Sequence, residues 1–236
     1  MLIAYAALDA SFLMLIRRIK KMYKCVMFDL DGTLCDTLRD LAEATNFALR
    51  VGGYPQQPLE KYKIMVGNGL TRLMERALPA EAVMKENVMA TRAAMLAYYQ
   101  QHLLDYTRAY PGITALVKRL KEQGKALYVV TNKPQAQASV IVETLFPDCF
   151  AGVAGQREGM PTKPDPWGIH LFMEEGGFAA EECLFVGDSN VDAQTAAAGG
   201  LECVGVTWGF RSRQELLDAG AGWAVDTAEE LETIIG

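Results

Sequence analysis

Histidine is scarce in this sequence, which contains only two in 236 residues. Neither His102 nor His170 neighbours any of the candidate motifs described below. A Ser-His-Asp triad and a histidine-rich metal site are therefore not expected. The five cysteines form no C-x-x-C pair and show no metal-ligand spacing, so we expect them to be small buried apolar residues in a reducing compartment.

Positive charge is also in short supply, because 29 acidic residues outnumber 23 basic ones and leave a formal net charge of -6. This balance argues against a nucleic-acid surface. Half of the residues are hydrophobic, so the chain can bury a sizeable core. We expect a cytoplasmic protein that is a monomer or a homodimer.

The first 21 residues differ in character from the rest. Residues 1–16 are apolar apart from Asp9 and Ser11, and the mostly basic residues 17–21 follow them. A secretory signal carries its positive charge before the apolar stretch, and sixteen residues with an Asp inside are short for a membrane span. Because Met22 directly precedes the first predicted strand, we expect residues 1–21 to be an N-terminal extension, either from an upstream start codon or as an amphipathic helix on a membrane or partner.

The most informative segment is the run Val-Met-Phe-Asp-Leu-Asp-Gly-Thr-Leu at residues 26–34. Apolar residues lead into two carboxylates and a Gly-Thr pair, which is typical of a buried strand that ends at a tight turn. Alternation along an extended chain predicts that Asp29 and Asp31 lie on the same side. Two carboxylates so close repel each other unless a cation separates them or one keeps its proton.

Three further segments carry polar residues at the end of apolar runs or on a stiff loop. Residues 125–132 form an apolar run that ends in Thr131 and Asn132. Lys163 lies among three prolines, which leave little room for regular structure. A third apolar run, from residue 183, ends in Gly-Asp-Ser-Asn-Val-Asp and supplies Asp188 and Asp192.

The pattern of apolar residues predicts an α/β fold. From residue 110 onward strands and helices alternate, which indicates a doubly wound parallel sheet, a Rossmann-like core made of residues 22–36 and 107–236. Residues 37–106 carry apolar residues at helical spacing and predict an inserted helical cap. Its helices are expected at 38–50, 58–66, 70–78 and 81–106. Ligands of such sheets bind beyond the carboxyl ends of the strands, where Asp29, Asp31, Thr131 and Asp188 are expected to meet.

Taken in this order, the four motifs resemble those of the haloacid dehalogenase superfamily: DxDGT, a Thr at a strand end, a loop Lys and GDxxxD. Hard oxygen ligands without histidine or thiolate suit Mg²⁺. The resemblance implies that Mg²⁺ is held by Asp29, the backbone carbonyl of Asp31, and Asp188. It also implies that Asp29 attacks phosphorus to give an aspartyl phosphate, and that Asp31 protonates the leaving group and then deprotonates water.

The same resemblance assigns the remaining polar residues. Thr131, Asn132 and Lys163 are expected to bind the phosphoryl oxygens of a small phosphorylated metabolite, and Asp192 to orient Lys163 or a metal-bound water. Dehalogenases usually lack the second Asp of the first motif, so Asp31 favours phosphate esters over halides.

The sequence of the predicted cap favours one class of substrate. Residues 66–78, together with Val-Val-Thr-Asn-Lys-Pro at 129–134, resemble phosphoglycolate phosphatases and favour 2-phosphoglycolate. Asn68 and Gly69 are candidate substrate-binding residues, and Arg72 is a second candidate donor from the cap. Related sugar phosphomutases carry a basic residue where Leu70 stands. The alternatives are a phosphomutase or pyrophosphatase of the same fold and a catalytically silent binding module.

Overall fold

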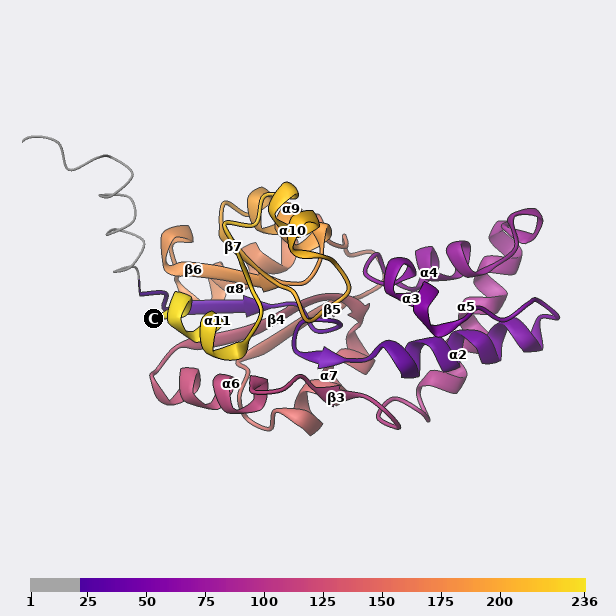
Figure 1. The fold of residues 1–236 in the computed structure, drawn as a ribbon, viewed down its shortest axis with the longest axis horizontal. Coiled ribbons are helices and arrows are strands. Elements are labelled where there is room, and N and C mark those ends of the chain that lie inside the picture. The colour runs from indigo at the N-terminus through magenta and orange to yellow at the C-terminus, as the bar shows by residue number, and fades with distance from the viewer. Residues whose placement is uncertain (1–21) are drawn as a thin grey trace, which may run out of the picture.

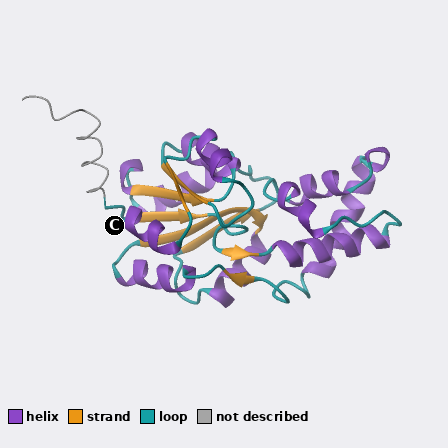
Figure 2. Ribbon diagram, viewed as in Figure 1, coloured by secondary structure: helices purple, strands orange, loops and turns teal. Residues whose placement is uncertain are grey.

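The computed structural model describes residues 22–236, so the expected N-terminal extension lies outside the described part. Its centre is a six-stranded sheet in which every neighbouring pair is parallel (Figures 1 and 2). The strand order is β5-β4-β1-β6-β7-β8. The strands are β1 (Cys25–Phe28), β4 (Ala126–Pro134), β5 (Gly152–Gln156), β6 (Cys183–Gly187), β7 (Glu202–Val206) and β8 (Trp223–Val225).

Helices cover both faces of this sheet, because consecutive strand residues point to opposite sides. In β1, Val26 and Phe28 belong to one buried cluster, whereas Cys25 and Met27 belong to the other. The first cluster is closed by α6 (Ile113–Glu122), α7 (Gln135–Leu145) and α11 (Ala228–Ile235). The second is closed by α8 (Trp167–Gly176), α9 (Asn190–Ala198) and α10 (Arg213–Asp218), with the short 3₁₀ helix η2 (Ala180–Glu182) before β6. The predicted doubly wound α/β fold is confirmed.

Residues 37–107, between β1 and α6, form a group of helices beyond the carboxyl ends of the strands, on the right in Figure 1. We call this group the cap. Apolar side chains of its helices pack together, and Tyr62, Met74 and Tyr99 are fully buried. The cap helices are α2 (Leu38–Val51), α3 (Leu59–Met65), α4 (Leu70–Ala77), the 3₁₀ helix η1 (Ala80–Ala82) and α5 (Lys85–Tyr99).

The two chain passages between sheet and cap are paired in a small antiparallel sheet of β2 (Cys35–Asp36) and β3 (Arg108–Ala109). The buried Asp40 carboxylate accepts hydrogen bonds from the backbone N–H groups of Tyr106 and Thr107 and from the Thr107 hydroxyl, at 2.7–3.1 Å. Asp40 therefore joins the chain entering the cap to the chain leaving it.

The predicted helix over residues 81–106 is wrong at both ends. Met84 has extended backbone angles and precedes α5, and η1 occupies residues 80–82. At the other end the chain leaves the helix after Tyr99 through turns in which the N–H groups of Gln101 and His102 bind carbonyls three residues back. The N–H groups of residues 106 and 107, which a helix reaching that far would use internally, bind Asp40 instead.

Strand β4 is longer than predicted. The apolar run was expected to end at Thr131 and Asn132, yet the strand continues to Pro134, which pairs with Gln156 of β5 after an irregularity. Pairing with β1 does stop at Val129, so Thr131 lies just past the last residue that pairs with β1. The polar residues of this segment are buried because each has a partner nearby, as described below.

All five cysteines are buried and free, as predicted. Within residues 22–236, none of the helices combines the length and apolar character needed to cross a membrane.

Candidate active site

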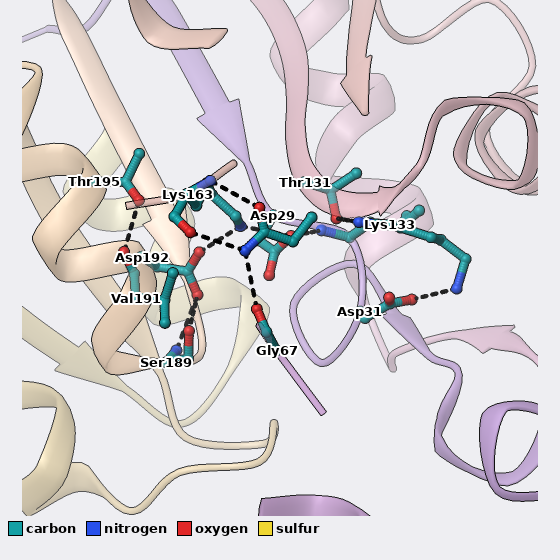
Figure 3. Close-up of polar contacts among 12 residues, drawn as sticks. Asp29, Asp31, Gly67, Thr131, Lys133, Lys163, Ser189, Val191, Asp192 and Thr195 are labelled. Carbon is teal, nitrogen blue, oxygen red and sulfur yellow. Dashed lines mark hydrogen bonds and ion pairs between the residues drawn. The ribbon is translucent and has the colours of Figure 1, made fainter. Parts of the chain in front are cut away.

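Asp29 lies where β1 ends, at the centre of the sheet edge that faces the cap (Figure 3). Its backbone N–H donates to the carbonyl of Val186 on β6 at 2.9 Å, which fixes its position between neighbouring strands. One carboxylate oxygen, Oδ1, accepts from the Leu30 N–H at 2.7 Å and from the Lys163 ammonium at 2.8 Å. Burial raises the pKa of the Asp29 carboxyl to about 6, while Lys163 pulls it in the opposite direction.

Lys163 is held by contacts to both its backbone and its side chain. Its N–H donates to Asn132 Oδ1 at 2.8 Å, and its carbonyl accepts from Asn132 Nδ2 at 3.1 Å. Its ammonium lies 2.6 Å from Asp192 Oδ1 as well as 2.8 Å from Asp29. Burial alone would lower the pKa of Lys163, but the two carboxylates outweigh it and raise the pKa, so this lysine is charged at neutral pH.

Asp192 lies in the first turn of α9 and is fully buried. Its Oδ1 accepts from Lys163, and its Oδ2 accepts from the N–H and hydroxyl of Ser189 at 3.0 and 2.6 Å and from the N–H of Asp188 at 3.2 Å. Both oxygens are thus engaged by the protein. Asp192 positions Lys163 and at the same time holds the turn that carries Asp188.

Asp29, Asp188 and Asp192 form a buried acidic cluster whose ligand atoms lie within 4.8 Å of one another. Asp188 Oδ2 accepts from the Phe210 N–H at 2.7 Å. Gly32 passes so close that an added Cβ would stand 2.3 Å from this oxygen, so the turn after Asp31 packs directly on Asp188. Burial and the neighbouring carboxylates raise the pKa of Asp188 well above its usual range.

This cluster has the properties of a cation site. Burying several carboxylates together is unfavourable unless a cation offsets their charge. Lys163 offsets part of it, and both oxygens of Asp192 already accept hydrogen bonds from the protein. The oxygens of Asp29 and Asp188 are hard donors suited to Mg²⁺, and the Asp31 turn lies against them. The residues therefore fit a divalent cation, and the pair predicted from the sequence, Asp29 and Asp188, is brought together.

Asp31 points away from the cluster toward the cap, as Figure 3 shows. Its Oδ1 lies 2.9 Å from the ammonium of Lys133, which also donates to the hydroxyl of Tyr99 on α5 at 2.6 Å. Burial alone would lower the pKa of Lys133, but Asp31 and Tyr99 outweigh it and raise the pKa. Lys133 was not among the predicted site residues. The signal available was a lysine placed between an apolar strand and a proline, directly after Thr131 and Asn132.

A cavity of about 390 Å³ lies between the sheet edge and the cap. Asp29, Asp31 and Thr131 contribute its polar floor, and the Thr131 hydroxyl accepts from the Lys133 N–H at 3.3 Å. The lining residues are Asp29, Asp31, Leu41, Val66, Gly67, Gly69, Leu70, Leu73, Thr131, Asn132 and Lys133.

Two contacts tie the cap to the sheet around this cavity. Asn132 Nδ2, which already binds the Lys163 loop, also donates to the Gly67 carbonyl at 3.2 Å. Arg211, in the loop before α10, donates to the carbonyls of Lys63 and Val66 at the end of α3, at 2.5 and 3.4 Å. Asn132 therefore connects the Lys163 loop to the cap.

The predicted cap residues are placed differently from one another. Gly69 lines the cavity at Asp29, whereas Asn68 and Arg72 line a neighbouring cavity with Gln156 and Thr162. The Asn68 side-chain oxygen accepts from Arg76 at 2.9 Å, and Arg72 pairs with Glu75. Those polar groups already have partners within α4 and its N-terminal turn.

A family model described as haloacid dehalogenase-like hydrolase matches residues 26–206. That match covers more than half of the chain, including every motif described above. The chain belongs to the haloacid dehalogenase-like hydrolase family.

Individual relatives match over most of their length. A phosphoglycolate phosphatase of Pseudomonas syringae pv. tomato is 33% identical over 217 residues, covering 89% of this chain and 79% of that protein. One from Haemophilus influenzae is 32% identical over 220 residues, covering 90% and 98%. A crystal structure from Lactobacillus delbrueckii subsp. bulgaricus is similar with a TM-score of 0.86 and 34% identity, covering 91% of this chain and 98% of that one. The family and these relatives together identify an enzyme of the phosphatase class.

Proposed function

We propose that this hydrolase is a Mg²⁺-dependent phosphomonoesterase that works through an aspartyl phosphate on Asp29. The observation that carries the proposal is the placement of Asp29, which lies on the cavity floor, beside the buried ammonium of Lys163, and within the acidic cluster. A carboxylate in this position faces a substrate while its charge is balanced by the protein.

Asp29, Asp188 and the backbone carbonyl of Asp31 would hold Mg²⁺, which would offset the repulsion between the nucleophile and a phosphate dianion. Lys163, whose ammonium lies 2.8 Å from Asp29, contributes further positive charge. Because Asp192 and Asn132 hold both ends of this lysine, its ammonium is placed before substrate arrives and costs little reorganisation.

Asp29 attacks phosphorus, and the ester oxygen leaves with a proton from Asp31. Asp31 then accepts a proton from the water that attacks the aspartyl phosphate, which releases inorganic phosphate and restores both carboxyls. The Thr131 hydroxyl and the Lys163 ammonium stabilise the charge on the phosphoryl oxygens. The cap excludes bulk water from the cavity while these steps take place.

The proposed substrate is a small phosphorylated metabolite, with 2-phosphoglycolate as the leading candidate. Relatives matched along most of the chain carry the name phosphoglycolate phosphatase. On the cap side the cavity that faces Asp29 is lined by the apolar side chains of Leu41, Leu70 and Leu73.

The test is phosphate release with and without Mg²⁺ from 2-phosphoglycolate, p-nitrophenyl phosphate, pyrophosphate and β-glucose 1-phosphate. We expect Mg²⁺-dependent turnover with 2-phosphoglycolate preferred. Asp29→Asn keeps the side-chain shape and removes the nucleophilic charge, so the turnover of this variant should fall to background. The variant should still fold, which a cooperative thermal unfolding transition would show. Residual activity above about a hundredth of wild type would contradict the role of Asp29.

Other outcomes of the same panel distinguish the alternatives. Pyrophosphate as the preferred substrate, or isomerisation of the sugar phosphate without phosphate release, would replace the phosphomonoesterase proposal. Binding without turnover of any ester would indicate a silent binding module.

A further inference from the structure

Lys133 is a second buried lysine of the site that has no part in the phosphoryl transfer described above. Its side chain is 1% exposed, and it lines the cavity on the side of the cap. Lys163 lies on the other side of Asp29 from Lys133, as Figure 3 shows. The site therefore has one cation at the phosphate end and another beside Asp31.

The two lysines differ in how their charge is balanced. The Lys163 ammonium contacts two carboxylates, Asp29 and Asp192. The Lys133 ammonium contacts one carboxylate, Asp31, and the neutral hydroxyl of Tyr99. An ammonium group has three N–H donors, so these two partners leave one donor direction of Lys133 for a third acceptor.

The remaining surroundings of Lys133 in the cavity are mostly apolar. Leu41, Val66, Leu70 and Leu73 form the cap side of the lining. Beside these apolar side chains the attraction between two opposite charges is stronger than in water. An anion therefore binds the Lys133 ammonium more strongly than an uncharged polar group does. The cavity therefore favours a leaving group that is compact and brings its own negative charge.

We propose that Lys133 binds a carboxylate of the leaving group and so selects phosphate esters that carry an anionic group one carbon from the ester oxygen. This inference rests on the proposed phosphomonoesterase function. Asp31 contacts the ester oxygen as it leaves, and the Lys133 ammonium is 2.9 Å from Asp31 Oδ1. A carboxylate one carbon from that oxygen would therefore lie close to the same ammonium.

Tyr99 acts in this arrangement as a positioning residue. Its hydroxyl, on cap helix α5, lies 2.6 Å from the Lys133 ammonium and is fully buried. The lysine is thus held between a carboxylate of the sheet edge and a hydroxyl of the cap. Carboxylate recognition is therefore coupled to the closed position of the cap.

The kinetic test compares 2-phosphoglycolate with ethyl phosphate, in which a methyl group replaces the carboxylate. In Lys133→Met, kcat/KM for 2-phosphoglycolate should fall about 100-fold further than kcat/KM for ethyl phosphate, because only the first substrate loses a charged hydrogen bond. Part of the loss is shared by both substrates, since Lys133 also orients Asp31. The ratio of the two losses is the readout.

The matched control is Lys125→Met. Lys125 is also a buried lysine, donating to the Tyr23 carbonyl at 2.9 Å at the start of β4, outside the cavity. Its replacement should leave the ratio of kcat/KM for the two substrates unchanged.

A binding test needs no variant and no turnover. Calorimetry on the Mg²⁺-loaded wild type should show that 3-phosphonopropionate binds at least about tenfold more tightly than propylphosphonate, which lacks the carboxylate. Tyr99→Phe should reduce that preference without removing it.

The outcomes separate this inference from the proposed function. Equal affinity for the two phosphonates, or equal losses on both esters in Lys133→Met, would refute the role of Lys133 even where the wild type hydrolyses phosphate esters. Failure of the wild type to hydrolyse any ester, with Asp29 intact, would instead overturn the proposed function.

Discussion

Replacement of Asp192 by Asn is the sharpest test of how the site is held together. The two side chains have the same shape, but Asn presents one acceptor oxygen and one NH₂ donor in place of two charged oxygens. Asp192 accepts four hydrogen bonds in the wild type, from Lys163, from the N–H and hydroxyl of Ser189, and from the Asp188 N–H. Either orientation of the amide therefore sets a donor against a donor.

The expected cost follows from these contacts. Removing one partner of a buried ion pair destabilises a protein by about 3–5 kcal/mol. Lys163 retains Asp29 as a partner at 2.8 Å, and removing one negative charge relieves repulsion with Asp29 and Asp188. We therefore expect about 3 kcal/mol less free energy of unfolding. For a protein of this size that corresponds to a fall in melting temperature of about 6–12 °C.

The measurement is urea and thermal unfolding followed by circular dichroism, with Asp226→Asn as the control. Asp226 pairs with Arg213 on the surface, where its side chain is 59% exposed, so its replacement should leave the melting temperature close to that of the wild type. An Asp192→Asn protein that unfolds within about 1 kcal/mol of wild type would refute the account of the Lys163 network. We also expect kcat to fall at least about 100-fold, because Lys163 is no longer aimed at the phosphoryl group.

Three further predictions follow from other parts of the structure. Asp31→Asn should lose more activity on 2-phosphoglycolate than on p-nitrophenyl phosphate, whose leaving group needs no proton, and equal losses would contradict its role as the acid. Mg²⁺ should raise the melting temperature more at pH 8 than at pH 5. Burial raises the pKa of Asp29 to about 6, so the metal-free fold loses stability as pH rises from about 4 to 6, and Mg²⁺ restores it only where the proton has left. A Mg²⁺ effect that is unchanged across this range would contradict the cation site. Asp40→Ala should cost about 3 kcal/mol in unfolding and increase protease cleavage near residues 100–107, because the N–H groups of Tyr106 and Thr107 lose their acceptor; wild-type stability would refute its joining role.

The sequence alone predicted the elements whose signal is local. Continuous apolar residues identified the strands that lead into Asp29 and Asp188, because burial on both faces of a parallel sheet requires such runs. Polar residues at the ends of those runs identified Asp29 and Asp188, because the carboxyl ends of parallel strands share one edge.

Elements that depend on distant partners could not be predicted in this way. Strands β2 and β3 are two residues each and exist only because they meet each other across the whole cap. The chain that follows α5 is held at Tyr106 by Asp40, which lies 66 residues earlier in the sequence. No periodicity within residues 81–106 carries that information.

The partners of the two lysines were likewise decided by tertiary structure. Lys133 meets Asp31 across 102 residues and Tyr99 across 34, and Lys163 meets Asp192 across 29. The sequence shows that these residues are charged, but it does not show whether a lysine beside a proline is solvated or buried. Lys133 becomes buried beside one carboxylate and one hydroxyl only when the cap packs against the sheet. Strand order and helix packing decide which distant side chains share a cavity.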